Sequence, residues 1–136
     1  MMRRYMQIVE NAQPYDPNHE APSNAAESVI YDLFHEGMVG YTDGGGMNVD
    51  VVNPNTVYLS RIWSNQPGSG HGSKLLRALC AACDEAHVGI ELEVGPDAEG
   101  PLDEAALVAW YDRYGFELDS EKSSLQGVNI MVREPQ

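Results

Sequence analysis

The fold of this chain is decided by residues 61–76, which read RIWSNQPGSGHGSKLL. A strand-like apolar stretch ends in alternating glycines at Gly68, Gly70 and Gly72, and an amphipathic helical pattern begins immediately after them. Glycine lets the backbone adopt positive φ and pass close to a ligand. The helix that follows presents free N–H groups and the positive end of its dipole at the same place. The stretch therefore predicts a strand–turn–helix unit that binds a phosphate or pyrophosphate.

The length and composition indicate a globular protein of one domain. The chain has 136 residues, of which 43% are hydrophobic, and a mean hydropathy of -0.36. No apolar run approaches the roughly 20 residues needed to cross a bilayer, so no membrane partner is expected. Residues 1–10 become polar too soon for a signal peptide. We therefore expect a cytoplasmic protein.

The charge balance is strongly acidic. Twenty-one acidic side chains stand against 8 basic ones, which gives a net charge of -13. Such a surface repels nucleic-acid phosphates and favours cationic partners such as amines or basic proteins. Solubility alone is an equally simple reason for the charge. We therefore expect no nucleic-acid partner and keep the cationic partner as a hypothesis.

The cysteines and histidines predict no metal site. Cys80 and Cys83 form a single C-x-x-C inside a helical pattern, and the chain has no second pair to complete a zinc site. They are expected to be small buried core residues. His19, His35 and His87 lack the spacing of metal ligands.

Hydrophobic periodicity and turn residues predict alternating strands and helices. A first helix should begin at a cap at Ser23 or Asn24 and end near Gly37. Residues 41–46 have the composition of a turn-rich break, and residues 53–55 form a tight turn that joins two strands as a hairpin. The other expected helices cover residues 73–87 and 102–114, and the expected strands cover residues 5–9, 47–52, 56–63, 89–94, 116–118 and 128–132.

Two motifs resemble those of one family. Residues 67–72 (PGSGHG), followed by Ser73-Lys74-Leu75-Leu76, are similar to the Q/R-x-x-G-x-G/A turn of the GNAT superfamily of acyl-CoA N-acyltransferases. Residues 110–117 (WYDRYGFE) resemble the family's second motif, aromatic-Tyr-x-x-x-Gly-Phe-Glu. The resemblance implies an α/β fold, with a mixed, mostly antiparallel central sheet, a splayed strand pair and flanking helices. It implies one such domain over residues 1–136.

Other glycine-rich phosphate sites fit this stretch less well. A nucleoside-triphosphate P-loop needs G-x-x-x-x-G-K-[ST], and Lys74 follows Ser73 at the wrong spacing. A Rossmann site needs G-x-G-x-x-G early in a βαβ unit, whereas this turn is G-x-G-x-G and follows a hairpin. Two positions also depart from the GNAT pattern, because Pro67 replaces the usual glutamine or arginine and Glu104 replaces an asparagine.

The resemblance implies a role for each candidate site residue. Backbone N–H groups at the strand end and at the turn would hold acetyl-CoA, with Ile62 or Trp63 polarising the thioester carbonyl. Tyr111 would protonate the leaving thiolate, and Glu93 would accept the proton of the amine. Glu91 and Glu93 alternate with apolar residues and are expected to face away from the apolar side of their strand. The expected cofactor-binding residues are Ile62, Trp63, Gly68, Ser69, Gly70, His71, Gly72 and Ser73.

The function implied by the resemblance is an acetyl-CoA-dependent N-acetyltransferase. The acceptor would be a primary amine, either a small amine or polyamine or a protein lysine or N-terminus, and it would attack the thioester directly. Two alternatives stay open. One is a catalytically silent acyl-CoA-binding regulator of the same fold, and the other is an acidic inhibitor or decoy that binds a protein. A homodimer also stays open.

Overall fold

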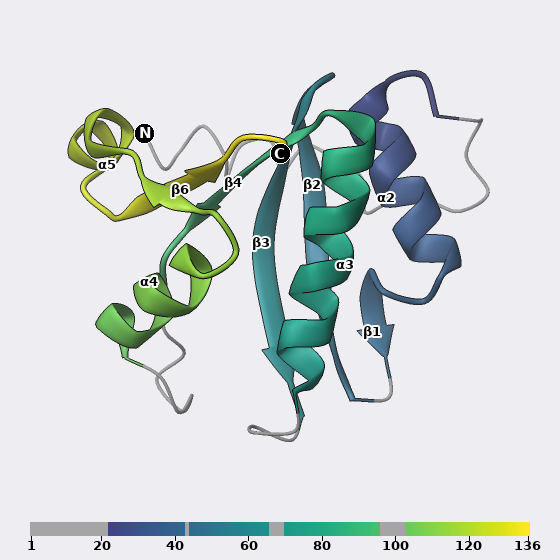
Figure 1. Cartoon of the computed structure of the whole chain (residues 1–136), viewed down its shortest axis with the longest axis horizontal. Helices are drawn as coiled ribbons and strands as arrows, with labels where there is room; N and C mark the ends of the chain where they lie inside the picture. Colours follow the sequence, from purple (N-terminus) through teal and green to yellow (C-terminus); the bar gives the residue numbers. More distant parts are fainter. Residues whose placement is uncertain (1–21, 43, 66–69, 96–102) are drawn as a thin grey trace.

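One mixed sheet organises the chain, and helices cover both of its faces (Figure 1). The computed structural model describes residues 22–42, 44–65, 70–95 and 103–136; the strand expected at residues 5–9 lies outside them. The elements, labelled as in Figure 1, are α2 (Ala25–His35), β1 (Gly40–Thr42), β2 (Gly45–Asn53), β3 (Thr56–Ser64), α3 (His71–Ala86), β4 (Gly89–Glu93), α4 (Glu104–Asp112), β5 (Glu117–Leu118), α5 (Ser120–Gln126) and β6 (Ile130–Arg133).

The sheet has the order β1-β2-β3-β4-β6-β5, and β3 and β4 are its parallel neighbours. The other neighbouring pairs are antiparallel. Pairing of β3 with β4 runs from Thr56–Gly89 to Leu59–Leu92. Beyond this point β3 continues to Ser64 along β2, and the two parallel strands separate (Figure 1). The expected mixed sheet with a splayed strand pair is thereby confirmed.

A β-bulge lies where β3 leaves β4. Val49 of β2 is opposite Leu59, but Asn48 is opposite Arg61, so β3 carries one extra residue, Ser60. The Ser60 hydroxyl donates to the Asn48 carbonyl at 3.1 Å. A bulge of this kind bends its strand and reverses the alternation of its side chains. Leu59 and Ile62 therefore both face the core although they are three residues apart.

The hydrophobic core lies between the sheet and the helix pair α2 and α3. Alternate residues of β2, β3 and β4, including Val49, Val57 and Ile90, pack with the apolar faces of these helices in one cluster. The cap at Asn24 is confirmed, since its side chain accepts from the Glu27 N–H. Cys80 and Cys83 are free and buried in this cluster, as expected from their pattern. Within the described chain, no helix is long and apolar enough to cross a membrane.

The structure corrects one prediction and adds one helix. The predicted break over residues 41–46 is instead a hairpin, in which Gly40–Thr42 of β1 pairs with Gly45–Met47 of β2. Helix α5 had not been expected because its sequence, SEKSSLQ, has no apolar face. Local capping defines it: Asp119 accepts from the Lys122 N–H at its start, and Gly127 ends it at a φ of 74°.

An ion pair joins the last strand to α3. The guanidinium of Arg133, a buried residue, donates to both carboxylate oxygens of Asp84, at 2.6 and 3.0 Å. Its Nε donates to the Tyr114 carbonyl at 2.6 Å, and the Gln136 N–H donates to Asp84. One charged group therefore connects α3, β6 and the turn after α4. The hydrogen bonds from Arg133 hold the pKa of Asp84 below its usual value.

We expect Asp84→Asn to lower the free energy of unfolding by about 3 kcal/mol, because it leaves the Arg133 charge buried without its counter-ion. The lowered pKa stabilises the fold above the unfolded-state pKa of about 4, and this contribution is lost as the pH falls through the native pKa. Urea unfolding at several pH values should therefore show a gap between variant and wild type at pH 7 that shrinks in acid. The exposed Asp32→Asn is the control, and an equal loss in both variants would contradict the role of the pair.

Candidate functional site

Helix α3 begins directly after Gly70, whose backbone is in the left-handed conformation. Gly70 has a φ of 84° and precedes the helix, and its carbonyl accepts from the Lys74 N–H at 3.0 Å. A Cβ placed on Gly70 would meet none of the described residues within 4 Å. The first turn of α3 carries no acidic side chain. Its free N–H groups therefore face a space where an anion would be stabilised. The predicted site residues Gly68 and Ser69 lie outside the described residues.

The indole of Trp110 on α4 packs against the first turn of α3. Its Nε1 donates to the Ser73 hydroxyl at 3.3 Å. A Cβ on Gly72 would lie 3.9 Å from the indole, an ordinary contact distance. Gly72 and Ser73, two of the predicted cofactor-binding residues, therefore contact the helix that carries Tyr111. Trp110 was not predicted as a site residue, although it directly precedes the tyrosine of the second motif.

The imidazole of His71 lies beside the turn between β1 and β2. A Cβ on Gly44 would lie 2.9 Å from Nδ1 of His71. The Gly44 carbonyl also accepts from the Asn65 N–H at 2.8 Å, just past the end of β3. The hairpin turn, the end of β3 and the start of α3 are thus held together at one corner of the molecule. His71 is the first residue of α3, so its backbone N–H lies at the N-terminus of this helix.

The end of β3 carries the other two predicted cofactor-binding residues. Ile62 packs on the core, and the indole of Trp63 lies against Gly46 of β2. A Cβ on Gly46 would overlap the Gly40 carbonyl and lie 2.6 Å from Cζ2 of Trp63, so no larger residue fits this position. The Arg61 guanidinium lies 4.7 Å from the Trp63 ring centroid. This part of β3 lies beyond its last pair with β4, which joins Leu59 to Leu92.

Tyr111 is a buried phenol at the end of α4. It is 7% exposed, with ring centroids of Trp110 and Phe116 at 5.0 and 5.4 Å. Burial raises the pKa of Tyr111 to about 12. The phenol is protonated at neutral pH, as an ordinary tyrosine is, and the raised pKa makes it a weaker acid. Its burial is that of a core residue, and its role as a proton donor stays a prediction.

Glu93 is the last residue of β4, one position beyond the final pairing of β4 with β3. It is partly buried, and burial raises its pKa. The hydroxyl of Tyr58, a buried residue of β3, is hydrogen-bonded to the backbone of Glu93. Burial, together with the negative charges of Glu93 and Asp50, raises the pKa of Tyr58 to about 12. Glu93 therefore sits where the strands part, in surroundings that make its carboxylate a better base than usual.

Comparison with known proteins gives matches in structure but not in sequence. No protein-family model and no curated protein matches the chain. Ard1 from Thermoplasma volcanium superposes with a TM-score of 0.53 at 17% identity, over 91% of this chain and 96% of that protein. The anti-CRISPR protein AcrVA5 gives 0.57 at 18% identity, over 68% of this chain and 93% of AcrVA5. A Klebsiella pneumoniae protein named as an acyl-CoA N-acyltransferase gives 0.50 at 20% identity, over 68% of this chain and 64% of that longer protein.

The chain has the GNAT fold. The strand pair that defines the GNAT fold is β3 and β4 here, and the turn of the first motif follows β3. The candidate residues come from both sides of the split between these strands. Ile62, Trp63 and the start of α3 lie on one side, and Glu93 and Tyr111 come from β4 and the helix that follows it.

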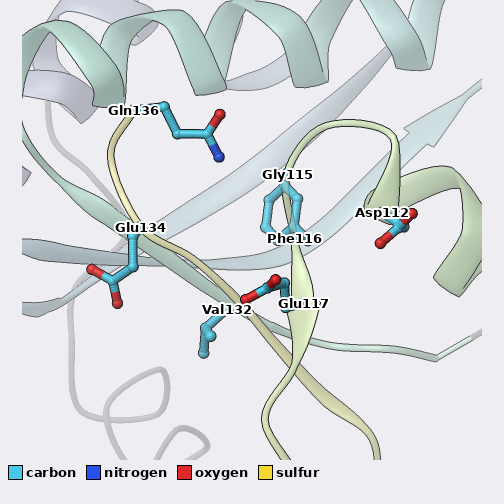
Figure 2. A pocket seen from close by; sticks show the side chains of 7 residues that line it. All are labelled: Asp112, Gly115, Phe116, Glu117, Val132, Glu134 and Gln136. Carbon is cyan, nitrogen blue, oxygen red and sulfur yellow. The ribbon is translucent and has the colours of Figure 1, made fainter.

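A separate cavity of about 320 Å³ lies near the C-terminus of the chain (Figure 2). None of the predicted site residues lines it, although four residues of the second motif do, so we do not place the acetyl-CoA site there. Among the described residues, no group of His, Cys, Asp and Glu is arranged to hold a metal ion. The cavity is lined by Asp112, Gly115, Phe116, Glu117, Val132, Glu134 and Gln136.

We expect Gly46→Ala to destabilise the protein by about 2–3 kcal/mol, because the new methyl group must displace a backbone carbonyl and the Trp63 indole. Gly72→Ala is the matched control, since its Cβ meets only an ordinary contact and alanine favours helix. Urea unfolding followed by tryptophan fluorescence measures both. A Gly46→Ala variant as stable as Gly72→Ala would show that the β1–β2 hairpin does not pack on Trp63 as described.

Proposed function

We propose that this protein is an N-acetyltransferase that transfers an acetyl group from acetyl-CoA to a primary amine. One observation carries the proposal: a left-handed Gly70, where an added Cβ would meet none of the described residues within 4 Å, precedes α3 beside a β3 strand that has left its parallel neighbour. A packed strand–helix turn needs neither the left-handed glycine nor the separated strand. Both are accounted for if a long ligand with a pyrophosphate lies along β3 and ends at the helix terminus.

Acetyl-CoA would be held mainly by backbone groups. N–H groups of residues 68–73 would bind the pyrophosphate, and Pro67 would remove only its own N–H from this set. Ile62 and Trp63, beyond the last β3–β4 pair, would run beside the pantetheine arm and direct a backbone N–H at the thioester oxygen. Glu104, which replaces the asparagine of the family pattern, lies at the start of α4, where Asn129 donates a hydrogen bond to it.

The reaction would proceed by direct attack of the amine on the thioester. Glu93, with its raised pKa, would take the proton from the ammonium directly or through a water molecule. The amine nitrogen would then form a bond to the acetyl carbonyl carbon, and the carbon–sulfur bond would break. Tyr111 would give its proton to the departing thiolate, and the second proton that the nitrogen loses on becoming an amide would return to the tyrosinate through solvent. The proton taken by Glu93 would pass to solvent. The products are an N-acetylated amine and CoA, and no other reactant is needed.

We expect Gly70→Val to weaken CoA binding at least about tenfold, because a branched side chain would occupy the space before the helix and strain a positive φ. Gly127→Val is the matched control, since Gly127 also has a positive φ, at 74°, with nothing within 4 Å of a Cβ, but it ends α5. Calorimetric titration with CoA measures both. Equal affinity in the two variants would contradict the binding site.

We expect Tyr111→Phe to leave acetyl-CoA affinity within about twofold and to lower kcat roughly a hundredfold or more, because phenylalanine fills the same space without the acidic proton. Thiol release in the presence of an amine measures kcat, and calorimetry measures affinity. Tyr114→Phe is the control, because Tyr114 also contacts Trp110 from the turn after α4. Full turnover by Tyr111→Phe would remove it from the mechanism.

A second candidate function is inhibition of a protein partner. The fold similarity to AcrVA5, over 93% of that anti-CRISPR protein, favours it, as does the net charge of -13. In this case the acidic surface would bind a basic face of the partner. Binding of acetyl-CoA without turnover of any amine would support the silent regulator, and absence of acetyl-CoA binding would support the inhibitor.

A further inference from the structure

The Trp110 indole links the helix that carries the candidate acid to the helix that begins at the candidate phosphate site. Its Nε1 donates to the Ser73 hydroxyl of α3 at 3.3 Å, across 37 residues of sequence. A Cβ on Gly72 would lie 3.9 Å from Cη2 and Cζ2 of the same ring. The ring centroids of Tyr111 and Tyr114 lie 5.0 and 5.9 Å from that of the indole. One side chain therefore contacts both the first turn of α3 and the phenol of Tyr111.

Packing holds the Tyr111 phenol in place. In the part of the chain that the structure describes, no hydrogen bond engages its hydroxyl, and burial is the cause of its raised pKa. Its ring contacts those of Trp110 and Phe116. Phe116 is completely buried and is fixed by the core, whereas Trp110 is partly exposed. The orientation of the phenol therefore depends on the indole, and the indole depends in part on its hydrogen bond to Ser73.

The Ser73 hydroxyl has a hydrogen to donate after it has accepted from Trp110. Ser73 is the third residue of α3, and the Lys74 N–H, one residue later, is the donor to the Gly70 carbonyl. The hydroxyl thus belongs to the turn whose N–H groups have no carbonyl of the helix to bond. A phosphate at this terminus would accept from these N–H groups and from the hydroxyl together. It would thereby fix the oxygen to which the indole donates.

We propose that Trp110 is a positioning residue, through which a phosphate bound at the start of α3 holds the Tyr111 phenol in place for acetyl transfer. The inference rests on the proposed function and adds a link between its cofactor site and its acid. Binding would fix Ser73, Ser73 would fix the indole, and the indole would limit rotation of the phenol. The link acts on kcat more than on acetyl-CoA affinity, because backbone N–H groups supply most of the phosphate contacts.

The first test is a double-mutant cycle between Trp110→Phe and Tyr111→Phe. Phenylalanine keeps an aromatic ring at position 110 but has no N–H to donate to Ser73. We expect Trp110→Phe alone to lower kcat about tenfold, while KM for acetyl-CoA changes less than about threefold. In the Tyr111→Phe background the same substitution should lower kcat less than about twofold, because the acid that it positions is already absent.

Tyr114→Phe is the matched control, because Tyr114 is the other tyrosine whose ring contacts Trp110. It should leave kcat unchanged in both backgrounds. A loss that is equal with and without the Tyr111 hydroxyl would show that Trp110 contributes general stability alone, and this result would overturn the positioning role. Full kcat in an active Trp110→Phe enzyme would overturn it as well.

A second measurement needs no turnover and separates this inference from the proposed function. In protein labelled with 3-fluorotyrosine, the fluorine resonance of Tyr111 is assigned by its loss in Tyr111→Phe. We expect saturating CoA to shift this resonance in the wild-type protein and to shift it much less in Trp110→Phe. Such a difference supports the link even if no amine is acetylated. Calorimetric CoA binding with equal shifts, or none, overturns the link and leaves the transferase in place, whereas absence of CoA binding overturns both.

Discussion

The separation of β3 from β4 after the Leu59–Leu92 pair is the constraint on which the rest of the structure depends. The bulge at Ser60 turns β3 away while keeping Ile62 in the core, so the strand leaves its neighbour without exposing its apolar face. The hydroxyl of Tyr58 is hydrogen-bonded to the backbone of Glu93, one residue beyond the last β3–β4 pair. The proposed ligand would lie between the separated strands.

Long-range contacts hold the two sides of the split at a fixed distance. On one edge, Arg133 connects Asp84 of α3 with the turn after α4. At the other end of α3, the Trp110 indole donates a hydrogen bond to the Ser73 hydroxyl. The C-terminal end of α4 and the turn after it are thus attached near the two ends of α3, and Tyr111 lies between Trp110 and Tyr114 in the sequence. The geometry of the candidate site therefore follows from ordinary packing and two polar contacts rather than from the glycine turn alone.

Much of this fold could be predicted from the sequence, because long apolar periodic segments and glycine turns are local signals. The hairpin of β2 and β3 and the helix α3 were found in this way. Residues 41–46 were not, because consecutive glycines predict a turn, and the Trp63 indole that makes Gly46 necessary is distant in sequence. Tyr58 was also missed, since only the strand register brings it beside Glu91. Helix α5 lacks a periodic apolar signal, so its role in burying Glu91 was not visible.

The most direct test of the account is hydrogen exchange of the wild-type protein with and without acetyl-CoA. Backbone amides that bind the ligand should exchange more slowly in its presence. The account predicts added protection in residues 60–64 and 70–76, on the opened strand and the start of α3, and none in residues 120–126 of α5. Binding without protection in these two segments, or protection confined to other parts of the chain, would contradict the site between the separated strands.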